Sequence, residues 1–432
     1  MTTTINNEHK KLNVPNKREQ NQSCLDSAER EGLRPNGNVP NLRFPEFRGE
    51  WEKVRLGEEC NMLCGYAFNG EDIVEQGSYL LMRGINITEG SIRHSSELDR
   101  YYSGSIEKLD KYKLAIGDLV IGMDGSKVGR NSAIVSSYED GSYLVQRVCR
   151  IRSSIGNNYI LQFINNTKFR QYVDTVKTSS AIPHISLRDI KNYRISIPST
   201  QDETDKIAKL FLLLDERIAT QNKIIEDLKK LKSAIIEKHY SQVKKQTTCI
   251  ADLGEPFSVG SLAKDDLAEI GSPCVIYGEL FTTYGEIIFH IESYTNKTDG
   301  MILSKKGDLL FPSSTTVDAM SLIAPSVINV DGVILGGDMF GIHINHNYNA
   351  QYLSYYFNHI AKKQLAKFAK GSTIIHLHYT DIEKAKLLLP SLEEQNRMAK
   401  CLVALDKKVS VEQNLLSSLT CQKSFLLQQM FI

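Results

Sequence analysis

Two stretches of this sequence, SAIPHISLRDIKNYRISIP at residues 180–198 and STIIHLHYTDIEKAKLLLP at residues 372–390, follow one pattern. Both have a histidine at the fifth position, an Asp-Ile pair from the tenth and a proline at the last. An internal repeat of this kind predicts that one structural unit is built twice. Each proline is followed by Ser and then by acidic residues, which is typical of a helix start, because Ser can cap the first turn and acids suit the helix dipole.

A heptad pattern follows each of these starts. Apolar residues recur in alternating steps of three and four, a spacing typical of helices that pack on one another. The predicted pairing seam contains Ile207, Leu210, Leu214, Ile224, Leu228, Leu231 and Ile235 in the first helix, and Met398, Leu405, Leu415, Leu419 and Leu426 in the second. Both seams turn polar at equivalent places, Gln221 in the first and Glu412 in the second. We expect the two helices, residues 201–246 and 392–432, to pack on each other antiparallel as a spacer.

The residues before each helix predict two globular domains, 42–200 and 247–391. Short β-like runs are split there by Gly, Asn and Asp turns, and each domain also holds an amphipathic stretch. A Gly-Asp-Leu strand opening recurs at residues 117–119 and 307–309. The predicted fold class is therefore mixed α/β (α+β), with two globular domains separated by two long antiparallel coiled-coil helices, and with an internal pseudo-two-fold repeat.

Composition sets limits on location and on charge. Residues 1–41 are polar and lack the apolar stretch of a signal peptide, which predicts a disordered lead-in on a cytoplasmic protein. No apolar run reaches the roughly 18 residues of a membrane span. Among the eight cysteines only Cys60 and Cys64 are close in sequence, so we expect no metal site. The formal net charge is +1, and any surface that contacts phosphate must therefore be local.

Several stretches resemble a known family. Leu-Arg-Phe-Pro-Glu-Phe at 42–47, Glu-Gln-Asn-Arg-Met-Ala at 394–399 and Leu-Leu-Gln-Gln-Met-Phe at 426–431 are similar to the specificity subunit of type I restriction–modification systems. The resemblance covers about residues 40 to 432. It departs from the family at 203–207, where the Gln that usually follows Glu is absent.

The resemblance implies a function for the two domains and the two helices. Each globular domain would read one half of a bipartite site on double-stranded DNA, and the helices would set the separation. Two modification subunits would dock along the helices and methylate adenines with S-adenosylmethionine. Motor-nuclease subunits, which use ATP and Mg, would join for restriction. No cofactor would bind to this chain itself.

Missing motifs indicate that the chain is not catalytic. An amino-methyltransferase of this kind holds its target amine with an Asp/Asn-Pro-Pro-aromatic loop, yet no proline here follows Asn, Asp or another Pro. A P-loop needs Gly-Lys before Ser or Thr, and Gly-Lys does not occur. We therefore predict a non-catalytic DNA-recognition subunit. Two other functions stay open: a coiled-coil adaptor that binds no DNA, and a stand-alone DNA-modifying enzyme.

Candidate DNA contacts in the first domain lie in a hydroxyl-rich loop and near a basic strand. Small hydroxyl residues beside a lysine can donate to phosphate oxygens, while Arg can bind guanine and Gln can bind adenine through two hydrogen bonds. The candidates are Lys127, Arg130, Gln146, Arg147, Arg150, Lys177, Thr178, Ser179, Ser180 and His184. The alternatives are a loop that only caps the domain, with a structural histidine, and a solvated strand face.

The second domain contains no arginine between residues 247 and 390. We therefore predict readout by Lys, Asn, Gln and Thr rather than by Arg–guanine pairs. The candidates are Lys305, Lys306, Ser313, Thr315, Lys363, Lys370, Ser372, Thr373 and His376. Four lysines between 362 and 370 have helical spacing, which fits either a stripe along the phosphates or a solvated helix face.

Overall fold

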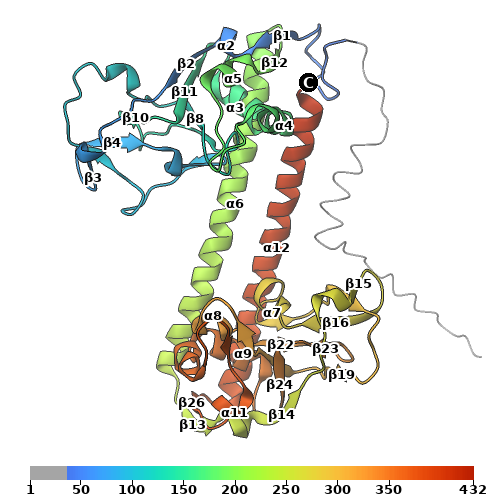
Figure 1. The fold of residues 1–432 in the computed structure, drawn as a ribbon. Helices are drawn as coiled ribbons and strands as arrows, with labels where there is room; N and C mark the ends of the chain where they lie inside the picture. The colour runs from blue at the N-terminus through green and yellow to red at the C-terminus, as the bar shows by residue number, and fades with distance from the viewer. Residues whose placement is uncertain (1–36) are drawn as a thin grey trace, which may run out of the picture. The chain divides into compact units, whose positions relative to one another are not determined.

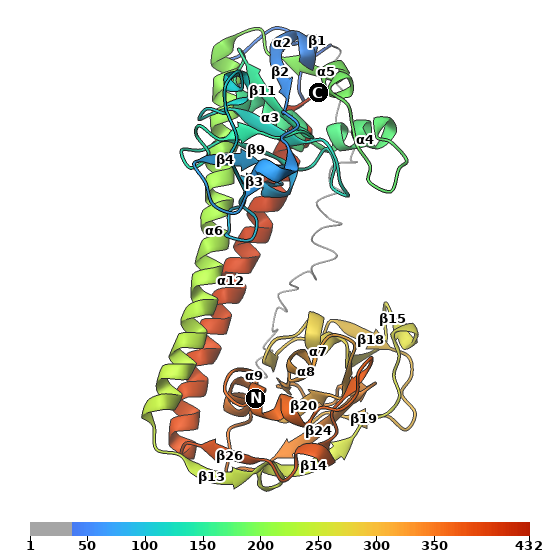
Figure 2. The same cartoon turned by 60° about the vertical axis from the view of Figure 1, so that its left-hand side comes forward.

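The computed structural model describes residues 37–432, so nearly all of the predicted lead-in over residues 1–41 lies outside the described residues. The described chain divides into two compact units, residues 37–220 with 416–432 and residues 221–415. Both divisions fall inside long helices, so each unit contains one globular domain and a part of both helices (Figures 1 and 2). We call them the first and the second unit.

The first unit contains two four-stranded sheets, of order β2-β11-β8-β9 and β10-β4-β7-β3, and the two-stranded pairs β1-β12 and β5-β6. Its strands are β1 (Glu52–Arg55), β2 (Cys60–Cys64), β3 (Ile73–Val74), β4 (Tyr79–Met82), β5 (Ile87–Thr88), β6 (Ser91–Ile92), β7 (Tyr101–Tyr102), β8 (Leu119–Gly122), β9 (Ser132–Ile134), β10 (Tyr143–Leu144), β11 (Val148–Ser153) and β12 (Arg194–Ile197). Its short helices are α2 (Leu56–Glu59), α3 (Asn157–Asn165), α4 (Thr167–Val176) and α5 (Leu187–Asn192).

The second unit contains two five-stranded sheets, of order β14-β24-β20-β22-β17 and β15-β18-β16-β23-β19, and the pairs β13-β26 and β21-β25. Its strands are β13 (Gln246–Cys249), β14 (Gly254–Ser258), β15 (Leu267–Ala268), β16 (Ser272–Ile276), β17 (Ile287–Ile288), β18 (Ser293–Thr295), β19 (Ile302–Leu303), β20 (Asp308–Pro312), β21 (Ser314–Thr315), β22 (Ser326–Ile328), β23 (Ile334–Gly336), β24 (Met339–Ile344), β25 (Ile375–His376) and β26 (Lys386–Leu389). Its short helices are α7 (Glu279–Thr282), α8 (Ala319–Leu322), α9 (Ala350–His359), α10 (Lys362–Leu365) and α11 (Tyr379–Ile382).

The repeated Gly-Asp-Leu opening makes the same structure in both domains. Its glycine has a positive φ, 86° at Gly117 and 96° at Gly307, which favours a residue without a Cβ. The aspartate then contacts a basic side chain on the neighbouring strand. Asp118 accepts from Arg152 at 2.5 Å, and Asp308 lies 2.6 Å from Nδ1 of His343. The motif therefore repeats because it turns the chain and fixes strands β8 and β20 against β11 and β24.

The two long helices are α6 (Gln201–Gln242) and α12 (Leu392–Met430), and they run antiparallel within each unit. In the first unit Phe211 packs on Phe431, whose ring centroid lies 5.5 Å away, and one turn further along α6 Asp215 pairs with Lys423. In the second unit Gln221 donates to the carbonyl oxygen of Glu412 (3.1 Å). Further along α6, Lys232 and His239 pair with Asp406 and Glu394, both at smaller residue numbers than Glu412.

Polar contacts between these helices repeat with a sequence offset of 191. Asp215 with Lys423, and Asp406 with Lys232, are the same pair made twice from equivalent positions. Gln221 and Glu412 are equivalent to each other, so this contact joins one position of the repeat to its own counterpart. This explains why both heptad patterns turn polar at the same place.

The predicted pairing seam is wrong by one residue at alternate positions. Ile224, Leu231 and Leu415 are 36%, 48% and 37% exposed, while the neighbouring Ile225 is buried at 7% and Lys232 at 9%. The error has a physical cause: apolar residues occupy two adjacent rows of α6, so the three–four spacing alone cannot decide which row faces the other helix. The other residues of the predicted seam are buried or half-buried.

Each end of the helix pair is anchored in a globular core. In the first unit α3 lies against the end of α12, with the rings of Tyr159 and Phe163 at 5.5 and 4.8 Å from that of Phe431 (Figure 1). In the second unit Tyr355 of α9 donates to Asp406 of α12. No helix among residues 37–432 combines the length and the apolar character that crossing a membrane requires.

Candidate nucleic-acid interface

Three loops meet at one edge of the first domain, and together they form what we call the first face. They are residues 123–130 after β8, 145–147 before β11 and 177–184 after α4. The amide of Met123 donates to the carbonyl oxygen of Arg147 (2.9 Å), and the carbonyl oxygen of Met123 accepts from the amide of Ile185 (2.9 Å). Gly125 donates to the carbonyl oxygen of Pro183 (3.0 Å). Main-chain hydrogen bonds thus fix the loops side by side, whatever side chains they carry.

The first face brings together nine of the ten candidates predicted in this domain. Exposed side chains at Lys127, Arg130, Gln146 and Arg147 lie on the first two loops. In the third loop the hydroxyl of Thr178 lies 2.9 Å from Nδ1 of His184, and Ser180 donates to a carbonyl oxygen, so these groups shape the loop. Ser179 is exposed beside them.

Two cations of the first domain are held by internal contacts. Arg150 is 6% exposed and donates to the carbonyl oxygens of Lys111 (2.9 Å) and Lys113 (3.4 Å), and burial lowers the pKa of its guanidinium. The prediction that Arg150 contacts DNA was therefore wrong, because β11 passes through the core and turns this side chain inward. Lys177 is half-buried and pairs with Asp174 (2.6 Å), whose pKa it lowers.

The second domain has an equivalent arrangement, which we call the second face. It consists of residues 313–316 after β20, 337–338 before β24 and 370–378. The amide of Ser313 donates to the carbonyl oxygen of Asp338 (2.7 Å), and its carbonyl oxygen accepts from Leu377 (2.9 Å). The three loops surround a cleft of about 570 Å³ lined by Ser313, Asp338, Lys370, Gly371, His376, His378 and Asp381.

Six candidates of the second domain lie on this second face: Ser313, Thr315, Lys370, Ser372, Thr373 and His376. Lys370 is exposed and pairs with Asp381, and this contact lowers the pKa of the aspartate. Asp338 and His378 also line the cleft, although sequence reasoning missed them. A signal for Asp338 was present in the sequence, because this residue lies directly before a strand, as Arg147 does.

Three lysine candidates of the second domain lie elsewhere. Lys305 and Lys306 precede β20 whereas Ser313 follows it, and five strand residues span about 17 Å. Lys363 lies on the short helix α10 and does not line the cleft. The chain leaves α-helical geometry between α9 and α10 and again after Leu365, where a 3-10 turn begins. Both interpretations of the four lysines between 362 and 370, a phosphate stripe and a solvated helix face, assumed a single helix, and that assumption was wrong.

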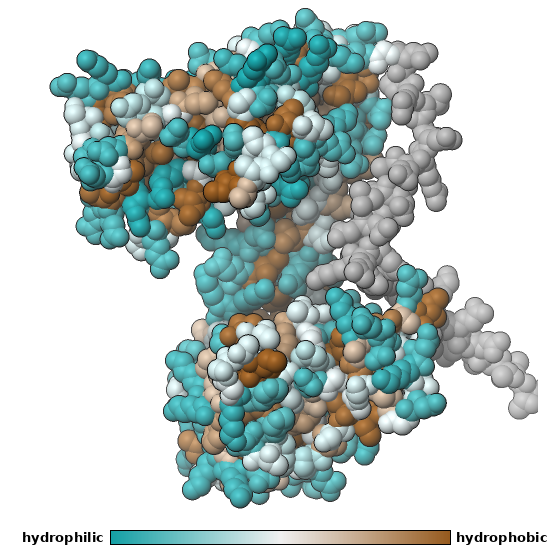
Figure 3. Space-filling view, in the orientation of Figure 1, coloured by the Kyte–Doolittle hydropathy of each residue, from teal (hydrophilic) through white to brown (hydrophobic). Residues whose placement is uncertain are grey.

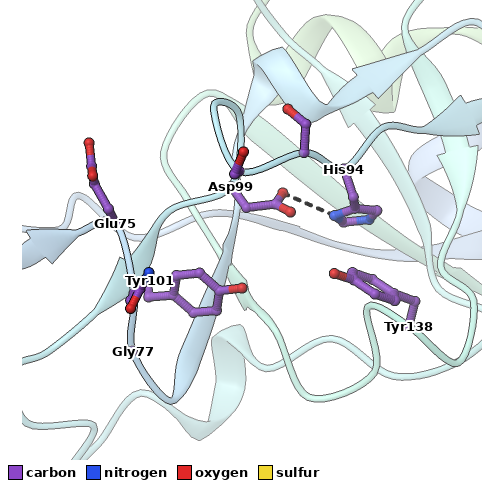
Figure 4. A pocket seen from close by; sticks show the side chains of 9 residues that line it. Glu75, Gly77, His94, Asp99, Tyr101 and Tyr138 are labelled. Atoms are coloured by element: carbon purple, nitrogen blue, oxygen red, sulfur yellow. Dashed lines mark hydrogen bonds and ion pairs between the residues drawn. The ribbon is translucent and has the colours of Figure 1, made fainter.

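The first domain also has a polar pocket of about 520 Å³ that sequence reasoning did not find. His94 bridges two buried carboxylates, with Nδ1 at 3.0 Å from Asp99 and Nε2 at 2.8 Å from Glu139. Figure 4 shows the hydroxyls of Tyr101 and Tyr138 directed toward each other across the pocket. Both ring nitrogens of His94 have partners, so the triad fastens the segments around 94–99 and 139 together. The pocket shares no lining residue with the first face.

Comparison with known proteins agrees with this geometry. The model of the type I restriction modification DNA specificity domain matches residues 48–230 and again residues 243–420. The specificity subunit of the type I restriction enzyme EcoAI from Escherichia coli is 29% identical over 179 residues, which cover 40% of this chain and 29% of that subunit. The MjaVIII specificity subunit from Methanocaldococcus jannaschii is 24% identical over 260 residues, 54% of this chain and 60% of that one. The matches thus span less than two thirds of either relative.

One solved structure is similar over nearly the whole chain. The S subunit of a type I restriction–modification system from M. genitalium aligns with a TM-score of 0.61 at 16% sequence identity. The alignment covers 91% of this chain and 99% of that one. This likeness shows a shared fold.

Proposed function

Because this chain belongs to the type I restriction–modification DNA specificity family, we propose that it reads a bipartite site on double-stranded DNA, one half-site with each globular domain. The observation that carries the proposal is the pair of equivalent faces. Both are built at the same strand ends by the same main-chain hydrogen bonds, and their side chains differ. Two domains that recognise different base sequences need the same main-chain arrangement of loops with different side chains on it.

We assign the roles along the chain by the same reasoning. Residues 42–200 and 247–391 form the two recognition domains, and 201–246 and 392–432 form the spacer helices. Lys127, Arg130, Gln146 and Arg147 would contact the first half-site. The cleft around Lys370 would contact the second, with Ser372, Thr373 and the hydroxyls at 313–315 beside the phosphates. Because the proposed role is on DNA, we infer that the protein is cytoplasmic.

The surface of the long helices supports a role in assembly. Large apolar side chains are exposed there at Leu212, Leu213, Ile224, Leu231, Val411, Leu415 and Phe425, and Figure 3 shows apolar residues on the visible face of these helices. Exposed apolar surface of this kind marks a protein–protein contact. We infer that modification subunits dock on it and supply S-adenosylmethionine and the methyl transfer, while motor-nuclease subunits supply ATP and Mg chemistry. This chain would contribute specificity alone.

The proposal is tested by expressing the chain with its modification partner in a host that lacks adenine methylation. Sequencing the methylated adenines should give one motif made of two half-sites with an unread gap. The purified chain alone should transfer no methyl group from S-adenosylmethionine. Methylation by the chain alone would support the stand-alone enzyme instead. A complex that forms but does not bind duplex DNA would support the adaptor.

A further inference from the structure

Arg147 and Asp338 occupy the same place in the two domains. Each directly precedes the central antiparallel strand, β11 or β24, and each accepts a main-chain hydrogen bond from the residue that follows β8 or β20. These residues, Met123 and Ser313, are in turn bonded to the third loop of their own face. The same frame therefore presents a guanidinium in one domain and a carboxylate in the other.

Arg147 is built for contact with something outside the domain. Its φ of 72° lies in the left-handed region, which is uncommon for a residue with a Cβ. Strained backbone of this kind is concentrated at functional sites. Its side chain is exposed, and no described residue pairs with its guanidinium. In the major groove an arginine donates two hydrogen bonds to O6 and N7 of guanine.

Asp338, which lines the second cleft, presents the opposite chemistry. Its side chain is exposed and accepts one hydrogen bond, from the hydroxyl of Ser314 (2.8 Å). Among the described residues no cation pairs with it, since the nearby Lys370 pairs with Asp381. A carboxylate facing DNA is repelled by phosphates. It is favourable where it accepts a hydrogen bond from a base amino group, N4 of cytosine or N6 of adenine.

We propose that Arg147 and Asp338 are equivalent specificity-determining residues of opposite preference. Arg147 selects guanine in the half-site read by the first domain. Asp338 selects a base with an amino group in the major groove in the half-site read by the second. The inference rests on the proposed function, since it presumes that both faces contact DNA. It adds a carboxylate to the Lys, Asn, Gln and Thr side chains that the sequence predicts as readers of the second half-site.

The first test compares the methylated motifs of variants in complex with the modification partner. Asp338→Ala should relax one position of one half-site, lowering discrimination there by about 10- to 100-fold, and should leave the other half-site unchanged. Arg147→Ala should do the same at one G·C position of the opposite half-site. Asp299→Asn, on an exposed turn of the same domain as Asp338, is the matched control and should change nothing.

The second test measures binding and does not need an active variant. Duplexes in which 2-pyrimidinone replaces cytosine, or purine replaces adenine, lack one amino group each. At one position such a duplex should bind the unaltered complex about 10- to 100-fold more weakly. The Asp338→Ala complex should not distinguish it from the natural duplex, because alanine has no acceptor for the amino group. The analogue that weakens binding identifies the base as cytosine or adenine.

The outcomes separate this inference from the proposed function. If the unaltered complex methylates no bipartite motif, the proposed function itself is wrong. If it methylates one, but the Asp338→Ala complex keeps both the motif and the penalty for the missing amino group, the role of Asp338 is refuted. An Arg147→Ala complex that still required every base of its half-site would refute the role of Arg147.

Discussion

The two faces share their main chain and differ in their charge. In both, the residue that follows β8 or β20 is hydrogen-bonded through its main chain to the residue before β11 or β24 and to the third loop of its face. Yet Arg147 in the first face is replaced by Asp338 in the second, and no arginine occurs between 247 and 390. The main-chain frame therefore does not depend on the side chains that would face DNA. Those side chains can change without loss of the fold.

The largest effect should come from exchanging a whole globular domain together with its face. Replacing residues 253–390 by the corresponding domain of a relative should replace one half-site completely and leave the other intact, because each domain has its own core. The measurement is the methylated motif of the chimaeric complex. A chimaera that altered both half-sites, or neither, would contradict the separation of the two faces.

A second comparison concerns how firmly each domain holds the end of a long helix. Phe431, 2% exposed, packs in the first core, while the equivalent Tyr240 is half-buried beside Tyr356 (5.7 Å). Phe431→Ala should destabilise the first unit by about 3–5 kcal/mol. Tyr240→Ala should destabilise the second by about half as much, since less of its surface is removed from water. Hydrogen exchange followed in each unit checks both, and equal losses would contradict the difference.

The sequence predicted what depends on neighbours along the chain. The repeat, the two long helices and the Gly-Asp-Leu openings are set by local spacing, capping and turn residues. The errors lie where distant residues decide. Ile224 and Ile225 are equally apolar, and only the opposite helix determines which is buried. Arg150 points inward because the carbonyl oxygen of Lys111, 39 positions away, accepts from it.

The candidate site also divides into features set by neighbouring residues, which the sequence predicted, and features set by distant residues, which it did not. Loops 123–130, 145–147 and 177–184 contain plausible contacts one by one, but only the hydrogen bonds of Met123 show that they form one surface. Asp338 drew no attention, because an acidic residue is not expected at a DNA interface. Its place directly before a strand was a signal in the sequence, but only the hydrogen bonds of Met123 and Ser313 show that Asp338 is equivalent to Arg147.

Acid should destabilise the second unit more than the first, and this effect should be smaller than those above. In the second unit the pair of Lys232 and Asp406 is extended by Glu286, 2.9 Å from Lys232 and from His359. Burial would raise the pKa of Glu286, but His359 and Lys232 lower it from 4.5 to about 2. A lowered folded-state pKa contributes stability that is present above the unfolded pKa, about 4.3, and lost as pH falls through the folded value.

The contribution of Glu286 is about 3 kcal/mol at neutral pH, and about half of it should be gone by pH 3. In the first unit the equivalent pair, Asp215 and Lys423, has no third charged partner among the described residues. Hydrogen exchange between pH 5 and 3 should therefore show a larger loss of protection in the second unit. Glu286→Gln is the control and should reduce this loss. A loss that is the same with and without Glu286 would contradict the assignment.

The smallest effect concerns the single lysine of each face that is already paired with an acid. Lys177 pairs with Asp174 and Lys370 with Asp381, so both must exchange a carboxylate for a phosphate when DNA binds. If each makes one phosphate contact, Lys177→Ala and Lys370→Ala should each reduce the slope of log affinity against log salt by about 0.9 and leave the methylated motif unchanged. Asp174→Asn should instead raise the affinity for DNA at low salt, because it frees Lys177 before binding.

Lys363→Ala is the comparison within the second domain, since Lys363 lies outside the cleft on α10. A slope that Lys363→Ala reduces as much as Lys370→Ala would move the phosphate contact away from the second face, and the likeness of the two faces would then end at their main chains.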